Sequence, residues 1–263
     1  MDISLNPTFT KYRSTIFFLL ILTFIVVFLS TAKYSQSDPK GTLLTAESIL
    51  QRGTIQLDYY GKEALQEYKY RIVKFNEHYY YNFPLGTSVI SLPFVAIANA
   101  FGFHMLQSEF ALQKIITALC AVLILFFLIK LARLFLSPFN AILSAIVFWS
   151  GTSFSSTCGS ELWSHDFAAL FALIAIYFSV KAAIYGKENY WPLIATSLFF
   201  AYLCRPTMSI LSPCLLLFLF SYYRYATIKI IIFMFSFLLT FSLLSYHEFH
   251  QLLPHYYMPT RLQ

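Results

Sequence analysis

The chain has 263 residues, of which 58% are hydrophobic, 19% are aromatic and only 11% are charged. Soluble domains have about 25% charged residues, and a single soluble core of this size could not bury the long uncharged segments and 29 Phe found here. The composition excludes a soluble globular protein and predicts an integral membrane protein. The formal net charge of +6 does not indicate nucleic-acid binding, because the Lys and Arg residues lie between the apolar segments.

The first apolar segment, residues 16–32, has nearly the length of about 20 residues that spans a bilayer. Lys11 and Arg13 precede it, and basic residues favour the cytoplasmic side, so we expect a cytoplasmic N-terminus. A signal peptide is the alternative, since Ser30-Thr31-Ala32 resembles a cleavage site. The segment exceeds the usual apolar core of about 7–15 residues, which favours an uncleaved anchor.

Residues 33–85 form a predicted first external loop. Apolar residues recur at helical spacing between Leu43 and Leu50, and Gly53 follows as a helix stop. This pattern predicts a short amphipathic helix lying on the membrane surface.

Farther along the same loop, residues 67–72 alternate apolar with charged positions. Asn76-Glu77 separates them from a tyrosine-rich segment, residues 78–83, and the pattern predicts a small hairpin. The tyrosines could stack on sugar faces or form an interfacial aromatic belt. The belt is the commoner use of tyrosine at a membrane, and we favour it unless one of them lines a cavity.

The rest of the chain consists of apolar segments separated by short polar ones. If the Pro93-containing segment 86–101 does not span, three basic pairs fall in cytoplasmic segments: Lys130/Arg133, Lys181/Lys187 and Arg224/Lys229. We therefore interpret it as a juxtamembrane or re-entrant helix. The remaining predicted spans are residues 112–129, 138–154, 167–180, 190–204, 207–223 and 228–246.

These segments predict an all-α fold, a polytopic transmembrane helical bundle of about seven spans, with residues 1–263 as a single module. Its C-terminal tail, residues 247–263, would be external. Every carboxylate except Asp2 and Glu188 would then also be external, so the functional face is predicted to be the outer one.

Asp38 is the first candidate catalytic residue. It lies at the outer boundary, where a carboxylate could take a proton from an acceptor as a general base. An Asp-Pro turn or a helix N-cap is a nearly equal alternative.

Glu161, His165 and Asp166 cluster just before a predicted span, where ionisable groups are functional by default. On a helix, Glu161 and His165 would share one face and could bind sugar hydroxyls or a divalent metal. The alternative is that Asp166 caps the following helix and Glu161 is solvated.

Two of the basic residues that remain on the outer side, against the usual preference, are candidate binding residues. Arg205 precedes Pro206 at a turn between spans, and an arginine there can bind a lipid phosphate through two hydrogen bonds. Lys114 offers a second cation at the same depth. Contact with ordinary lipid headgroups is the alternative for both.

The order of these features resembles the GT-C class of polytopic glycosyltransferases, which includes protein O-mannosyltransferases and the lipid A aminoarabinose transferase. The residues that carry the resemblance are Asp38, Ala46, Leu50, Gly53, Phe83-Pro84-Leu85-Gly86, Lys114, Trp163-Ser164-His165-Asp166, Tyr246-His247-Glu248 and Tyr256-Tyr257-x-Pro259-x-Arg261.

The resemblance implies sugar transfer from a polyprenyl-phosphate donor to a glycan, lipid or protein acceptor on the outer face, with Asp38 as base. A bacterial cytoplasmic membrane is the expected location. Pro39 replaces the second acidic residue usual in that class, and the chain is short for it. A truncated member, a non-catalytic subunit and a membrane carrier stay open as alternatives. The sequence lacks P-loop, dinucleotide and HExxH motifs, which excludes nucleotide hydrolysis and zinc proteolysis.

Overall fold

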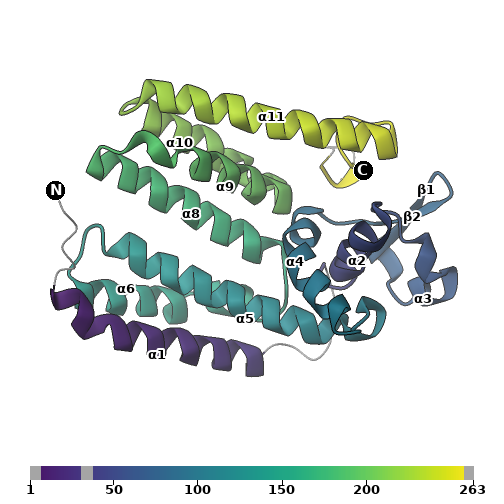
Figure 1. Cartoon of the computed structure of the whole chain (residues 1–263), viewed down its shortest axis with the longest axis horizontal. Helices are drawn as coiled ribbons and strands as arrows, with labels where there is room; N and C mark the ends of the chain where they lie inside the picture. The colour runs from purple at the N-terminus through teal and green to yellow at the C-terminus, as the bar shows by residue number, and fades with distance from the viewer. Residues whose placement is uncertain (1–6, 31–37, 258–263) are drawn as a thin grey trace.

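The structure is a computed structural model that describes residues 7–30 and 38–257 (Figure 1). The main helices are α1 (Pro7–Ser30), α2 (Thr42–Arg52), α4 (Gly86–Ala100), α5 (Met105–Ala132), α6 (Pro138–Gly151), α8 (Ser164–Tyr185), α9 (Trp191–Cys204), α10 (Leu211–Phe220) and α11 (Arg224–Phe249). Two short strands are β1 (Ile72–Phe75) and β2 (His78–Tyr81). Short helical turns are η1 (Asp58–Tyr60), α3 (Lys62–Gln66), η2 (Lys69–Arg71), α7 (Phe154–Thr157), η3 (Glu188–Tyr190), η4 (Pro206–Ile210) and η5 (His255–Tyr257). The predicted all-α membrane-helical bundle is confirmed.

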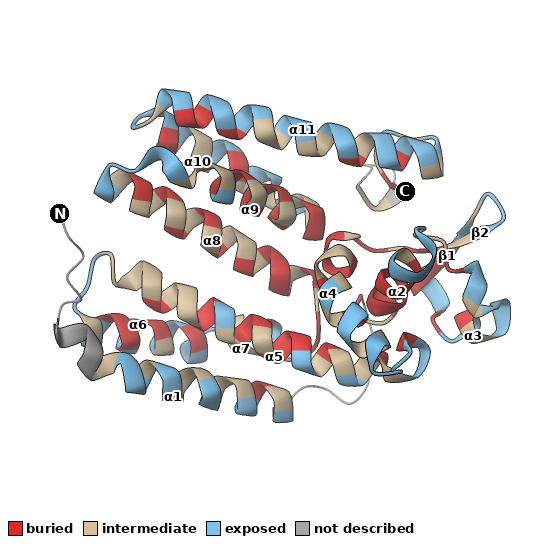
Figure 2. Cartoon of the chain, in the orientation of Figure 1, coloured by how far each residue is buried: buried red, intermediate tan, exposed pale blue. Residues whose placement is uncertain are grey.

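In the described part of the chain, four helices are long and apolar enough to cross a membrane, namely α1, α5, α8 and α11. Exposed residues follow the outer faces of α1 and α11 (Figure 2). Several of them are large and apolar, such as Phe17 at 66% and Phe235 at 65%. Such faces are favourable against lipid and costly against water. The shorter α6 and α9 have 14 residues each, about 21 Å of helix.

Two groups of helices meet at the contact between α5 and α8. The helix α5 packs against α1 and α6, whereas α8 packs against α9, which in turn packs against α11. Residues 38–104, here called the head, lie at one end of this bundle, and the connections α5–α6, α8–α9 and α10–α11 lie at the other (Figure 1).

The predicted amphipathic helix of the head is present as α2. It ends at Gly53, whose φ of 69° is left-handed and whose N–H bonds to the Ile49 carbonyl at 3.0 Å, as expected for a glycine stop. Its apolar face packs on protein, and its place at the membrane surface stays a prediction. Residues 42–48 are all buried, because α2 packs against α4 and α5.

The predicted hairpin is also present, with β1 and β2 antiparallel and Ile72 opposite Tyr81. Asn76 and Glu77 form its turn with positive φ angles of 45° and 69°, the geometry of a two-residue hairpin turn. The first strand begins at Ile72 rather than at residue 67, because a helical turn at Lys69–Arg71 precedes it.

The helix α4 lies with α2 at the head end of the bundle (Figure 1) and packs against it. Its first residue, Gly86, lies against the end of α9. A Cβ at Gly86 would lie 2.4 Å from the backbone nitrogen of Cys204, so only glycine permits this approach. The Phe83-Pro84-Leu85-Gly86 step thus joins the head to the bundle.

The predicted topology can be tested with reporter fusions. A reporter fused after Phe103 should be external, and one fused after Arg133 should be cytoplasmic, because the basic pairs favour the cytoplasm. The measurement is reporter activity on each side of the membrane. The opposite pair of results would contradict the seven-span topology and place α4 across the bilayer.

Candidate active site

Asp38 lies where the head meets the bundle, and only 8% of it is exposed. The Tyr81 hydroxyl donates a hydrogen bond to the Asp38 carbonyl, and the Thr42 hydroxyl donates to the same carbonyl at 3.1 Å. Burial raises the pKa of Tyr81, so its hydroxyl keeps its proton and remains a donor. The backbone carbonyl of Asp38 therefore anchors this turn, and the carboxylate can make other contacts.

The Asp38 carboxylate does not cap α2. The N-cap residue is Gly41, which has no side-chain cap. Glu109 of α5 accepts the Gly41 N–H at 2.8 Å and a second N–H of the first turn at 3.0 Å. Gln113, one turn later in α5, donates to the Pro39 carbonyl at 2.6 Å. Glu109 thus stabilises the helix N-terminus. Neither of these two α5 residues was predicted from the sequence.

The carboxylate of Asp38 instead contacts the first turn of α8. Ser164 Oγ donates to Asp38 Oδ2 at 3.1 Å, and Arg205 Nη1, at the end of α9, donates to Ser164 Oγ at 3.4 Å. A guanidinium stays protonated in proteins. The Ser164 hydroxyl therefore connects a permanent cation, Arg205, to the Asp38 carboxylate. We call Asp38, Ser164, His165 and Arg205 the Asp38 group.

His165 belongs to the group through its contact with Arg205. Arg205 Nη1 lies 3.3 Å from His165 Nδ1, and because a guanidinium only donates, Nδ1 is the acceptor and the ring proton is on Nε2. The ring of Trp163 stacks on His165 at 5.4 Å between centroids. The orientation of His165 is therefore fixed from two sides.

Asp166 and Glu161 lie close to the group. The alternative given for Asp166, a cap of the following helix, is confirmed, whereas the solvated position given for Glu161 is not. Asp166 is fully buried, and its Oδ2 accepts the backbone N–H of Trp163 at 3.2 Å, so it closes the start of α8. Glu161 is buried, not solvated, and precedes the helix, which begins at Ser164. Glu161 and His165 therefore do not share one helix face.

Lys114 is oriented towards another part of the bundle. Its ammonium group lies 4.8 Å from the centroid of the Phe28 ring of α1, a cation–π contact. Within the described part of the chain, no hydrogen bond or ion pair joins Lys114 to the Asp38 group. The structure thus brings together Asp38, His165 and Arg205 of the predicted site residues, but not Lys114.

The chain returns to this region after α11. The Tyr257 hydroxyl donates to the Leu203 carbonyl at 2.5 Å, two residues before Arg205, and Gln56 of the head donates to the Glu248 carboxylate at 3.3 Å. Pro259 and Arg261 of the same motif lie outside the described residues.

A metal site was one interpretation of the His and carboxylate cluster. Across residues 7–30 and 38–257, no group of three or more His, Cys, Asp or Glu side chains is placed to hold a metal ion. Glu161 and His165 therefore have no ligand set in that part of the chain.

The family described as dolichyl-phosphate-mannose-protein mannosyltransferase matches residues 92–252. The match includes Ser164, His165, Asp166 and Arg205, whereas Asp38 lies before it. No curated protein and no solved structure matches the chain.

Proposed function

We propose that this chain, which belongs to the dolichyl-phosphate-mannose-protein mannosyltransferase family, moves a sugar from a polyprenyl-phosphate donor to an acceptor at the head end of its bundle. Family membership makes it a GT-C-type glycosyltransferase and an integral membrane protein. The donor, the acceptor face and the residues that act are our proposal.

One observation carries the proposal. The carboxylate of Asp38, from the head, is held by Ser164 of α8, which also contacts Arg205 of α9. Sugar transfer from a lipid phosphate needs a base for the acceptor proton and a cation for the phosphate that leaves. The Asp38 group offers both, at the end of a bundle whose outer faces suit lipid.

The proposed reaction is a single displacement. An acceptor hydroxyl oxygen attacks the anomeric carbon of the donor sugar, and Asp38 takes the proton of that hydroxyl. The bond from the anomeric carbon to the phosphate oxygen breaks, and its electron pair stays with the polyprenyl phosphate. Arg205 stabilises the negative charge on that phosphate, and the configuration at the anomeric carbon inverts.

Ser164 is then a positioning residue. Ser164→Ala should lower kcat about tenfold, at the low end for a hydrogen bond to a charged group, while donor KM stays unchanged. Ser164→Thr should restore most of the rate, because it keeps the hydroxyl. Ser221→Ala, at the opposite end of the bundle, is the matched control. A changed donor KM with an unchanged kcat would contradict this role.

The proposed activity is tested with the purified full chain in nanodiscs, a radiolabelled polyprenyl-phosphate sugar and membrane extract as acceptor. Labelled acceptor and free polyprenyl phosphate should form in equal amounts. If the chain is a non-catalytic subunit, it should transfer no sugar alone. Transfer should then appear when a larger, copurifying partner is added. Labelled donor carried across the membrane unchanged would favour the carrier alternative.

A further inference from the structure

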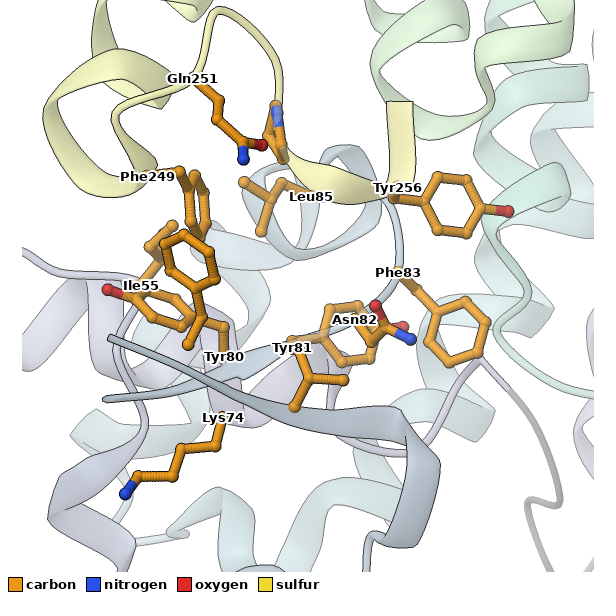
Figure 3. Close-up of a pocket in the computed structure, with 13 residues that line it drawn as sticks. Ile55, Lys74, Tyr80, Tyr81, Asn82, Phe83, Leu85, Phe249, Gln251 and Tyr256 are labelled. Carbon is orange, nitrogen blue, oxygen red and sulfur yellow. The ribbon is translucent and has the colours of Figure 1, made fainter. Parts of the chain in front are cut away.

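A cavity of about 420 Å³ lies between the β1–β2 hairpin and the segment that follows α11 (Figure 3). Its volume is in the range of small-molecule sites, about 300–1,000 Å³. It lies between the head and the C-terminal segment and is separate from the Asp38 group, since neither Ser164 nor Arg205 lines it.

Aromatic side chains form two sides of the cavity (Figure 3). On one side the rings of Tyr80 and Phe249 meet at 4.8 Å between centroids, inclined by 56°. On the other, Phe83 contacts Tyr81 at 5.6 Å and Tyr256 at 5.9 Å. Two tyrosines of the hairpin, Tyr80 and Tyr81, therefore line a cavity. The aromatic belt was favoured only if none of them did, so this position favours stacking on a sugar.

Apart from Lys74, the polar side chains that line the cavity are neutral. Asn82 and Gln251, both half-buried, contribute side-chain amides that can donate and accept hydrogen bonds. Among the described lining residues only Lys74 carries a charge, and its ammonium group lies 2.5 Å from the Glu77 carboxylate. Such a lining suits an uncharged ligand better than a phosphate.

We propose that this cavity binds a neutral pyranose ring of the acceptor, which makes the acceptor a glycan or a glycoconjugate. This assignment rests on the function proposed above. A pyranose has a face of C–H groups that packs on aromatic rings and an edge of hydroxyls that bonds to amides. The cavity offers both kinds of partner, and few polar groups on an apolar lining are typical of specific small-molecule sites.

The cavity is connected to the proposed base through one side chain. Tyr81 lines the cavity, and its hydroxyl donates to the Asp38 carbonyl. Only the Tyr81 side chain would separate a sugar bound there from Asp38. The next sugar unit of the same acceptor could then present its hydroxyl to the carboxylate.

The test is saturation-transfer NMR on the full chain in nanodiscs, with methyl glycosides of glucose, mannose, galactose and N-acetylglucosamine as probes. At least one should bind. Asn82→Ala should weaken that binding about two- to tenfold, the range for one hydrogen bond. Tyr80→Ala should weaken it by a similar factor through lost ring contact. Tyr59→Ala, an exposed aromatic outside the cavity, is the matched control and should bind as the wild type does.

Two results would overturn the proposal. One is a folded wild type that binds none of the four glycosides, and the other is unchanged binding by Asn82→Ala. Because Tyr80 is buried and its variant could fail to fold, the half-buried Gln251→Ala serves as the second variant. If the chain transfers sugar but binds no glycoside, only the proposed role of the cavity is refuted. If glycosides bind in the cavity but the chain transfers no sugar, the proposed function is refuted and the sugar-binding site remains.

Discussion

Asp38→Asn should lower sugar transfer by about 10²–10⁴-fold, the usual contribution of general acid–base catalysis, while fold and donor binding are retained. The asparagine oxygen can still accept the Ser164 hydrogen bond, and Gly41 rather than Asp38 caps α2. The substitution therefore removes the proton acceptor while it keeps this hydrogen bond and the cap of α2. The measurement is the transfer rate at saturating donor, with thermal stability and donor binding recorded on the same preparation.

Asp58→Asn is the matched control, because Asp58 is an exposed carboxylate of the head that pairs with His78. It should transfer sugar at the wild-type rate. Near-normal transfer by Asp38→Asn would refute the proposed role and direct attention to Asp166 or Glu161, the two buried carboxylates next to the group.

Arg205→Ala should weaken binding of a polyprenyl phosphate by about 1.5–3 kcal/mol, the usual size of a hydrogen bond to a charged group. Arg205 is half-buried at the end of α9, and its partners there are a hydroxyl and a neutral imidazole, so it has charge left to offer a phosphate. The measurement is the Kd of the lipid in nanodiscs of fixed composition.

Arg224→Ala is the control for this prediction, since Arg224 begins α11 at the opposite end of the bundle. It should bind the donor lipid normally. If Arg205→Ala binds polyprenyl phosphate as tightly as the wild type does, Arg205 contacts ordinary headgroups instead.

Local patterns predicted most of the fold. Gly53 ends α2, and the Asn76-Glu77 pair forms the hairpin turn, because positive φ angles and turn preferences depend on a few adjacent residues. The helix α5 begins at Met105, earlier than the apolar segment predicted. Its first two turns pack against the head, and such tertiary contacts cannot be inferred from apolar periodicity.

The site was predicted in part, for the same reason. Asp38, His165 and Arg205 were found because charge or a ring nitrogen at a membrane boundary is unusual. Ser164 carries no charge, and its contact with Asp38 joins residues 126 positions apart. Glu109 was missed because the predicted span began after it, at Leu112, so its position against α2 could not be inferred.

The central claim is that Asp38 is the base and that Ser164 of α8 acts by holding its carboxylate. The most direct test is the transfer rate of the double variant Asp38→Asn/Ser164→Ala, compared with both single variants. Because Ser164 is proposed to act only through Asp38, the double variant should transfer sugar as slowly as Asp38→Asn alone. A further loss of about tenfold, the full effect of Ser164→Ala added to that of Asp38→Asn, would contradict the account.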